Sequence, residues 1–142
     1  MSDGADRMSP SILAVVVIAV LGLINVARGS LHLFLPDSGA GVIAGLDLEN
    51  GRAIVVSFLA AVGVGQLGMA LVDFTAVLFQ RALIRPLLFI HTLMEGGAVF
   101  LLFYWKPLPT AVPGQWGALA GFVVLGLITA IEVSRAPSHA KA

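Results

Sequence analysis

Apolar residues form four long runs along this chain, and glycine, proline and charged residues separate one run from the next. The runs cover residues 11–35, 53–79, 86–105 and 112–131. Each run is close to the roughly 20 residues that an α-helix needs to cross a bilayer. The pattern predicts an all-α, polytopic membrane protein built as a bundle of four transmembrane helices.

The composition supports this prediction. Hydrophobic residues make up 58% of the chain, charged residues 11%, and the mean hydropathy is +1.00. These values lie outside the range of soluble globular proteins. A length of 142 residues predicts a single integral membrane domain, residues 1–142, whose first partner is the lipid bilayer.

Charge and cysteine content exclude several classes of function. Eight Lys and Arg residues balance eight Asp and Glu residues and form no basic tract, so we expect no nucleic-acid partner. The chain has no cysteine, which excludes disulfide relays, thiol-dependent quinone reduction and iron–sulfur ligation by thiolates.

The first run has two interpretations. Arg7 followed by the apolar residues 12–24 resembles the start of a secretory signal. However, Asn25-Val26-Ala27 is a poor match to a small-x-small cleavage site, and the apolar run continues to Leu35. We therefore expect the first helix to be retained.

The connection between the first two runs, residues 36–52, is the longest and is rich in glycine. It is too polar to span a membrane, although its residues 42–48 are apolar enough for a short segment at the membrane surface. A plain connecting loop fits the same residues. The third connection, residues 106–111, contains Pro107 and Pro109 and predicts a stiff turn.

Basic residues near the helix ends predict the orientation, because cytoplasmic loops are enriched in Lys and Arg. The face with both termini and the second connection carries five of them, namely Arg7, Arg81, Arg85, Arg135 and Lys141. The opposite face carries Arg52 and Lys106. We therefore predict a multi-pass membrane protein with both termini in the cytoplasm.

One face of the first predicted helix carries an amide, a fixed positive charge and an imidazole. Asn25, Arg28 and His32 lie at positions i, i+3 and i+7. An arginine at the bilayer centre costs about 2.5–3.5 kcal/mol on insertion scales, so it normally faces the protein interior and finds a partner. Arg28 is therefore the strongest pointer to a functional site in the sequence.

Polar residues also mark one face of the second and third predicted helices. Gln66 and Asp73 are spaced i, i+7, and His91 and Glu95 are spaced i, i+4. Because lipid cannot solvate these groups, the three polar faces should point toward one another. We expect a polar bundle interior formed by Asn25, Arg28, His32, Gln66, Asp73, His91 and Glu95.

Counting along each helix from its cytoplasmic end suggests which polar residues meet. At about 1.5 Å per residue, Glu95, Gln66, Asn25 and Arg28 lie about 15, 20, 21 and 25 Å deep. An Arg28–Glu95 ion pair follows, with Asn25 and Gln66 satisfying the remaining donors and acceptors. Either this pair only fixes helix register, or it borders a ligand-sized cavity that opens toward the outer face near His32.

Asp73 and His91 both lie about 9 Å deep, which predicts a second pair. This pair fits either a proton relay or a plain interhelical hydrogen bond. The Glu-x-x-His spacing of di-iron bundles is absent, so we predict no metal site. His32 and His91 differ by roughly 20 Å in depth, too far to ligate one haem, and the residues do not identify a cofactor.

The first run ends in Arg28-Gly29-Ser30-Leu31-His32-Leu33-Phe34-Leu35-Pro36, followed by the Gly-rich connection and three more runs, with Glu95 in the third. This pattern resembles the DoxX-like group of small four-helix bacterial membrane proteins. The resemblance covers most of the chain in architecture and carries no catalytic motif. It implies a membrane subunit located in the bacterial inner (cytoplasmic) membrane, since some relatives are associated with respiratory or quinone-linked oxidoreductases.

The sequence as a whole predicts a non-enzymatic integral membrane subunit or accessory protein that binds a quinone or a lipid head group in the polar core. No nucleophile–base pair or metal cluster indicates an enzyme. The alternative is a small transporter or channel component with Glu95, Asp73 and His91 on its pathway. A subunit would pack against a larger membrane complex, whereas a transporter of this size would form a homo-oligomer.

Overall fold

The computed structural model describes residues 9–107 and 111–135. These residues form four long helices, α2 (Ile12–Phe34), α3 (Arg52–Leu78), α4 (Ile84–Phe100) and α5 (Pro113–Arg135). A 3-10 turn, η1 (Arg81–Leu83), precedes α4, and a π-helical turn, η2 (Leu101–Trp105), extends it. With η1, α4 and η2 counted as one span, the structure has four helices long and apolar enough to cross a membrane. The predicted fold class is confirmed.

Local sequence explains several of the helix boundaries. The Ser11 hydroxyl caps α2 by accepting a hydrogen bond of 3.1 Å from the N–H of Ala14. Leu35 ends this helix in an extended conformation, as expected for the residue before a proline. Gly51 supplies the positive φ of 83° that opens α3. α5 begins at Pro113, where the missing N–H costs no helical hydrogen bond.

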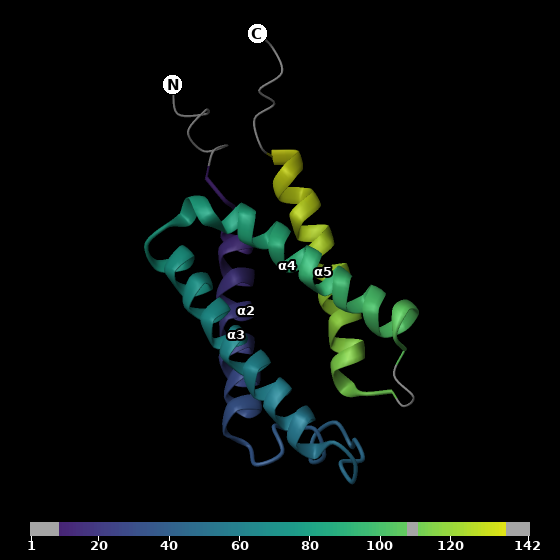
Figure 1. Ribbon diagram of the computed structural model, residues 1–142. Helices are drawn as coiled ribbons and strands as arrows, with labels where there is room; N and C mark the ends of the chain where they lie inside the picture. The colour runs from purple at the N-terminus through teal and green to yellow at the C-terminus, as the bar shows by residue number, and fades with distance from the viewer. Residues whose placement is uncertain (1–8, 108–110, 136–142) are drawn as a thin grey trace, which may run out of the picture.

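The helices are arranged as two antiparallel hairpins, α2 with α3 and α4 with α5 (Figure 1). The hairpins meet at the end of the molecule that carries both chain termini, and they diverge toward the other end. α4 runs obliquely across α2 and α3, whereas α2 and α3 lie side by side along their length.

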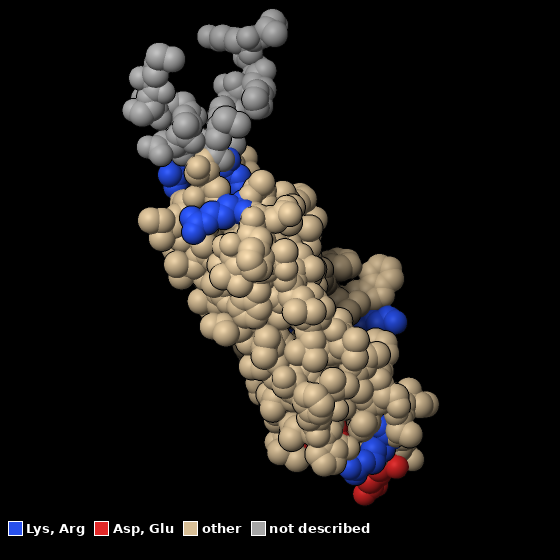
Figure 2. All heavy atoms as spheres, turned by 90° about the vertical axis from the view of Figure 1, so that its left-hand side faces the viewer, with Lys and Arg blue, Asp and Glu red and all other residues tan. Residues whose placement is uncertain are grey.

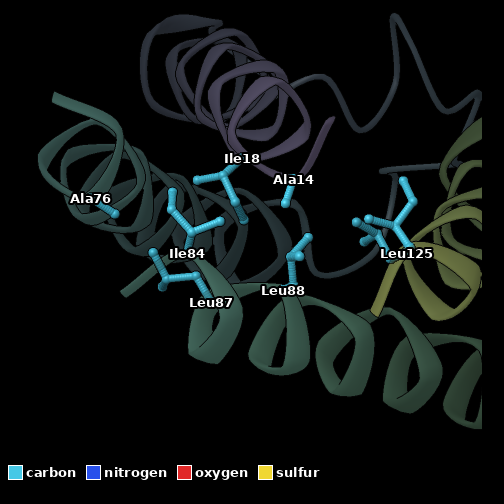
Figure 3. Packing of buried hydrophobic residues seen from close by; sticks show 8 residues of the cluster. Ala14, Ile18, Ala76, Ile84, Leu87, Leu88 and Leu125 are labelled. Atoms are coloured by element: carbon cyan, nitrogen blue, oxygen red, sulfur yellow. The ribbon is translucent and has the colours of Figure 1, made fainter. Parts of the chain in front are cut away.

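The apolar core lies where the two hairpins meet (Figure 3). All four helices contribute to it, through Ala14, Ile18, Ala76, Ile84, Leu87, Leu88, Leu125 and Ile128. Ile18, Ile84 and Leu88 are fully buried. Because lipid tails are as apolar as these side chains, close packing rather than water exclusion holds the helices together here.

Small residues allow α2 and α3 to approach closely. A Cβ added to Gly63 would lie 2.8 Å from the carbonyl oxygen of Gly29, and one added to Gly29 would lie 2.9 Å from that of Gly63. Both distances are too short for a real Cβ, so the crossing requires glycine on both helices.

The surface agrees with a protein that lies in a bilayer. Most of the face shown in Figure 2 is uncharged, with basic residues near the end that carries the termini and charges of both signs at the opposite end. Large apolar side chains such as Phe58, Leu71 and Leu127 are exposed along the helices. Lipid would cover these side chains, and the chain is a multi-pass membrane protein.

The connection between α2 and α3 is built from turns and irregular chain, including residues 42–48. The Asp37 carboxylate organises it by accepting hydrogen bonds from the N–H groups of Gly39 (2.9 Å), Gly41 (3.0 Å) and Val42 (2.7 Å). These bonds hold the pKa of Asp37 below its usual range, the Val42 bond contributing most.

Three residues used in the sequence predictions, Arg7, Pro109 and Lys141, lie outside the described residues.

Candidate functional site

Asp73 on α3 is fully buried, and side chains from two other helices contact its carboxylate. Nε2 of His91 on α4 lies 2.9 Å from Oδ1, and Nδ2 of Asn25 on α2 donates a hydrogen bond of 3.3 Å to Oδ2. The predicted contact between Asp73 and His91 is confirmed. This buried cluster links three of the four long helices.

A cavity of about 270 Å³, which we call the polar cavity, lies between the two hairpins. Five of the seven predicted polar residues line it, namely Asn25, Arg28, Gln66, His91 and Glu95. The rest of its wall comes from α4, η2 and the beginning of α5, through Met94, Ala98, Leu102, Val112, Gly114, Gln115 and Ala118. The cavity predicted from the sequence is therefore present, and its biological role stays a prediction.

Arg28 and Glu95 both line the polar cavity but do not form the predicted ion pair. No ion pair or hydrogen bond joins them, and Arg28 has no such side-chain partner within residues 9–107 and 111–135. Glu95 packs against Gly121 of α5, where an added Cβ would lie 3.4 Å from Cγ and Cδ of the glutamate. Asn25, expected beside this pair, contacts Asp73.

These two predictions were wrong because a residue count gives relative depth only for helices that run parallel from a common plane. α4 crosses the other hairpin obliquely, so a count along α4 gives only an approximate level relative to α2 (Figure 1). The partner of Asp73 on α4 was predicted correctly, whereas the partners of Arg28 and Asn25 were not.

Gln66 has a buried atom without a hydrogen-bond partner. Its Oε1 is shielded from solvent, and no described residue donates to it. Buried polar atoms are almost always hydrogen-bonded, and leaving one unsatisfied costs about 1–3 kcal/mol. Gln66 lines the polar cavity, so a turn of its side-chain amide would present this oxygen to a donor group on a molecule in that cavity.

His32 lies outside the polar cavity. Its Nδ1 is 2.8 Å from the carbonyl oxygen of Ser38, so the ring anchors the beginning of the α2–α3 connection. His32 lines a second cavity of about 330 Å³, which we call the loop cavity because this connection forms part of its wall. Arg28 lines both cavities, in agreement with the predicted opening from Arg28 toward His32.

One cluster of charged residues was not predicted. Glu132 on α5 accepts a hydrogen bond of 3.3 Å from the N–H of Ser11 and forms ion pairs with Arg85 (3.1 Å) and Arg135 (3.6 Å). The predicted fourth helix ended at residue 131, which placed Glu132 in the tail, but α5 continues to Arg135. Opposite charges at one end of neighbouring helices were the signal that could have revealed this cluster.

Comparison with protein-family models, with curated proteins and with solved structures finds no match to this chain. Within the described ranges, no three His, Cys, Asp or Glu side chains are grouped closely enough to hold a metal ion. The fold and the site define a multi-pass membrane protein with a polar cavity between its helices.

Proposed function

We propose that this protein is a non-enzymatic membrane subunit or accessory protein, of the DoxX-like kind, that binds the head group of a quinone in the polar cavity. The observation that carries the proposal is the set of unsatisfied polar groups on the cavity wall. Arg28 has no ion-pair partner among the described residues, and Oε1 of Gln66 has no hydrogen-bond donor.

Arg28 is an exposed side chain on a membrane-spanning helix and has no ion-pair partner among the described residues. Together with the unsatisfied Gln66 oxygen, this favours a bound molecule over a purely structural role. Polar groups that only fix the relative position of neighbouring helices would pair with one another directly, as Asp73 does with His91 and Asn25. Arg28 instead presents several N–H donors to a space of about 270 Å³. A ligand with hydrogen-bond acceptors fits that wall.

The charges on the wall favour a neutral head group over an anionic one. Arg28 is positive and Glu95, when ionised, is negative, and both line the same cavity. A lipid phosphate drawn to Arg28 would also meet the field of Glu95. A quinone carbonyl accepts hydrogen bonds from Arg28 without carrying a charge, and a reduced quinone can donate to Gln66. We therefore prefer a quinone to a lipid head group.

The cellular setting forms part of the same proposal. The basic residues at the end with both termini support a bacterial inner membrane location with those termini in the cytoplasm. The exposed apolar surface leaves room for a larger membrane complex or for further copies of this chain.

The first test measures the binding of duroquinone, a benzoquinone without a chain, to the purified protein in lipid nanodiscs. Losing one hydrogen bond to a charged group costs about 1.5–3 kcal/mol, so Arg28→Gln should weaken binding about 10- to 100-fold. Gln66→Leu should weaken binding of the reduced form more than that of the oxidised form. Arg81→Gln removes an exposed charge outside the cavity and is the control. Unchanged affinity in both cavity variants would refute the proposal.

A second candidate function, proton-coupled transport, is favoured by one specific observation. His91, held by the buried Asp73, lines the same cavity as Glu95, so protonatable groups border one space. This candidate predicts that proteoliposomes show a proton flux that Glu95→Gln abolishes. Quinone binding without a proton flux would instead support the proposed membrane subunit.

A further inference from the structure

The loop cavity differs from the polar cavity in the character of its wall. Its lining is apolar apart from two side chains at one end, Arg28 and His32. The apolar wall comes from α2, α3, the α2–α3 connection and the beginning of α5, through Leu31, Leu59, Ala40, Ile43, Ala44, Leu46, Val112 and Pro113. Nδ1 of His32 is bonded to the Ser38 carbonyl. Most of this wall therefore suits an apolar group.

The two cavities adjoin each other. Arg28, Val112 and Gly114 line both of them. Arg28 therefore stands between a space with polar walls and a space with apolar walls. A molecule that occupies both spaces needs a polar head joined directly to an apolar chain.

We propose that the loop cavity binds the proximal part of the hydrocarbon chain of the same ligand whose head group occupies the polar cavity. The ligand class is then a neutral head group with a single prenyl or alkyl chain. The chain would pass Arg28 and lie against the α2–α3 connection. This inference rests on the proposed function, since it assigns a place to the chain of the ligand proposed there.

Two substitutions narrow the chain path, and Ala44→Phe does so without changing the polar wall, because Ala44 lines the loop cavity alone. Ala44→Phe places a large side chain in the loop cavity, where Ala44 is part of the lining. Gly114→Leu adds a side chain at the junction of the cavities, where an added Cβ meets no other atom within 4 Å.

Each variant has a matched control on the same element. Val42 lies in the same connection, is 84% exposed and does not line the loop cavity, so Val42→Phe controls for Ala44→Phe. Gly117 is one turn further along α5, an added Cβ there also meets no atom within 4 Å, and it lines neither cavity. Gly117→Leu therefore controls for Gly114→Leu.

The experiment compares a tail-less benzoquinone with the same benzoquinone carrying a decyl chain, bound to nanodisc-embedded protein. Affinities are expressed per mole fraction in the lipid, which removes the difference in membrane partitioning. The chain-bearing compound should bind more tightly to the wild type. Ala44→Phe should weaken its binding about tenfold or more and leave the tail-less compound unchanged, because one methylene too many in a hydrophobic pocket costs about 10- to 200-fold. Gly114→Leu, whose position lines both cavities, should weaken binding of the chain-bearing compound more than that of the tail-less one. The two controls should behave as wild type.

The outcomes separate this inference from the proposed function. If both compounds bind the wild type equally, or if the variants and their controls weaken the chain-bearing compound alike, the chain site is refuted and the head-group site stands. If neither compound binds the wild type, the proposed function fails and the chain site fails with it. Thermal unfolding of each variant confirms that altered binding does not reflect loss of the fold.

Discussion

At the scale of single residues, three carboxylates in the described part of the chain are almost inaccessible, and each is satisfied by a different kind of partner. Asp37 is held by backbone N–H groups of its own loop, Asp73 by His91 and Asn25, and Glu132 by Ser11 and two arginines. A buried charge without partners is very costly in an apolar medium. Arg28 differs from these three groups because it has no ion-pair partner among the described residues. For this reason the cavity that Arg28 lines is the preferred ligand site.

The lowered pKa of Asp37 predicts how the α2–α3 connection responds to acid. Its ionised form is stabilised by the loop N–H groups, so this contribution is fully present above its ordinary pKa of 3.8. The contribution is lost as the pH falls through the lower value of the folded state. The Val42 amide resonance should therefore shift with a midpoint below pH 3.8.

The control for this titration is Asp37→Ala, in which the acid-dependent shift of Val42 should disappear. A midpoint above 3.8 in the wild type would contradict the role assigned to the three N–H groups. Because residue 37 lies outside the helices, the titration reports on the loop and leaves the helix packing unchanged.

At the scale of elements, glycine decides how closely α2 and α3 pack. Polar contacts between transmembrane helices average only about 0.6 kcal/mol in membranes, so van der Waals contact along the helices matters correspondingly more. The crossing at Gly29 and Gly63 brings each backbone within reach of the other's carbonyl oxygen. By contrast, a Cβ on Gly65, on the same helix, would meet nothing within 4 Å.

This difference gives a matched pair of substitutions. Gly63→Ala places a methyl group 2.8 Å from a backbone oxygen that cannot move aside locally, so it should lower the free energy of unfolding by about 1–3 kcal/mol. Gly65→Ala adds the same group in open space and removes a poor helix former, so stability should be unchanged or higher by up to about 1 kcal/mol. Reversible unfolding in detergent measures both. Equal effects of the two changes would mean that the crossing is not tight.

At the scale of the whole molecule, the two hairpins share one apolar core and one charged cluster, both at the end with the chain termini (Figures 1 and 3). Away from that end the hairpins diverge, and the polar cavity is lined by residues of both. The molecule therefore combines close packing at one end with a cavity between the two hairpins.

The orientation of the molecule can be tested directly. Both termini lie at one end of the structure, and Arg81, Arg85 and Arg135 lie in helix-end segments at that end, so both termini should face the cytoplasm. A reporter active only in the cytoplasm, fused after Ala142, should give signal. A reporter active only outside, inserted at Gly41, should also give signal. Activity of the outside reporter at the C-terminus would reverse the assignment.

The sequence by itself determined the number of helices, their approximate bounds and which of their faces are polar. The thickness of a bilayer sets the length of an apolar run, and lipid cannot solvate side chains such as Arg28 or Gln66. Those constraints act on each helix separately, so they can be read from local sequence. They sufficed to predict a cavity lined by Asn25, Arg28, Gln66 and Glu95.

Apart from the Asp73–His91 contact, only the tertiary structure decided which polar groups touch. Asn25 pairs with Asp73, Glu95 packs on Gly121 and Arg28 stays without an ion-pair partner among the described residues because α4 crosses its neighbours obliquely. Crossing angles arise from the packing of all four helices together, so no single run of sequence contains them. A contact of about 3 Å depends on those angles, whereas the choice of a helix face does not.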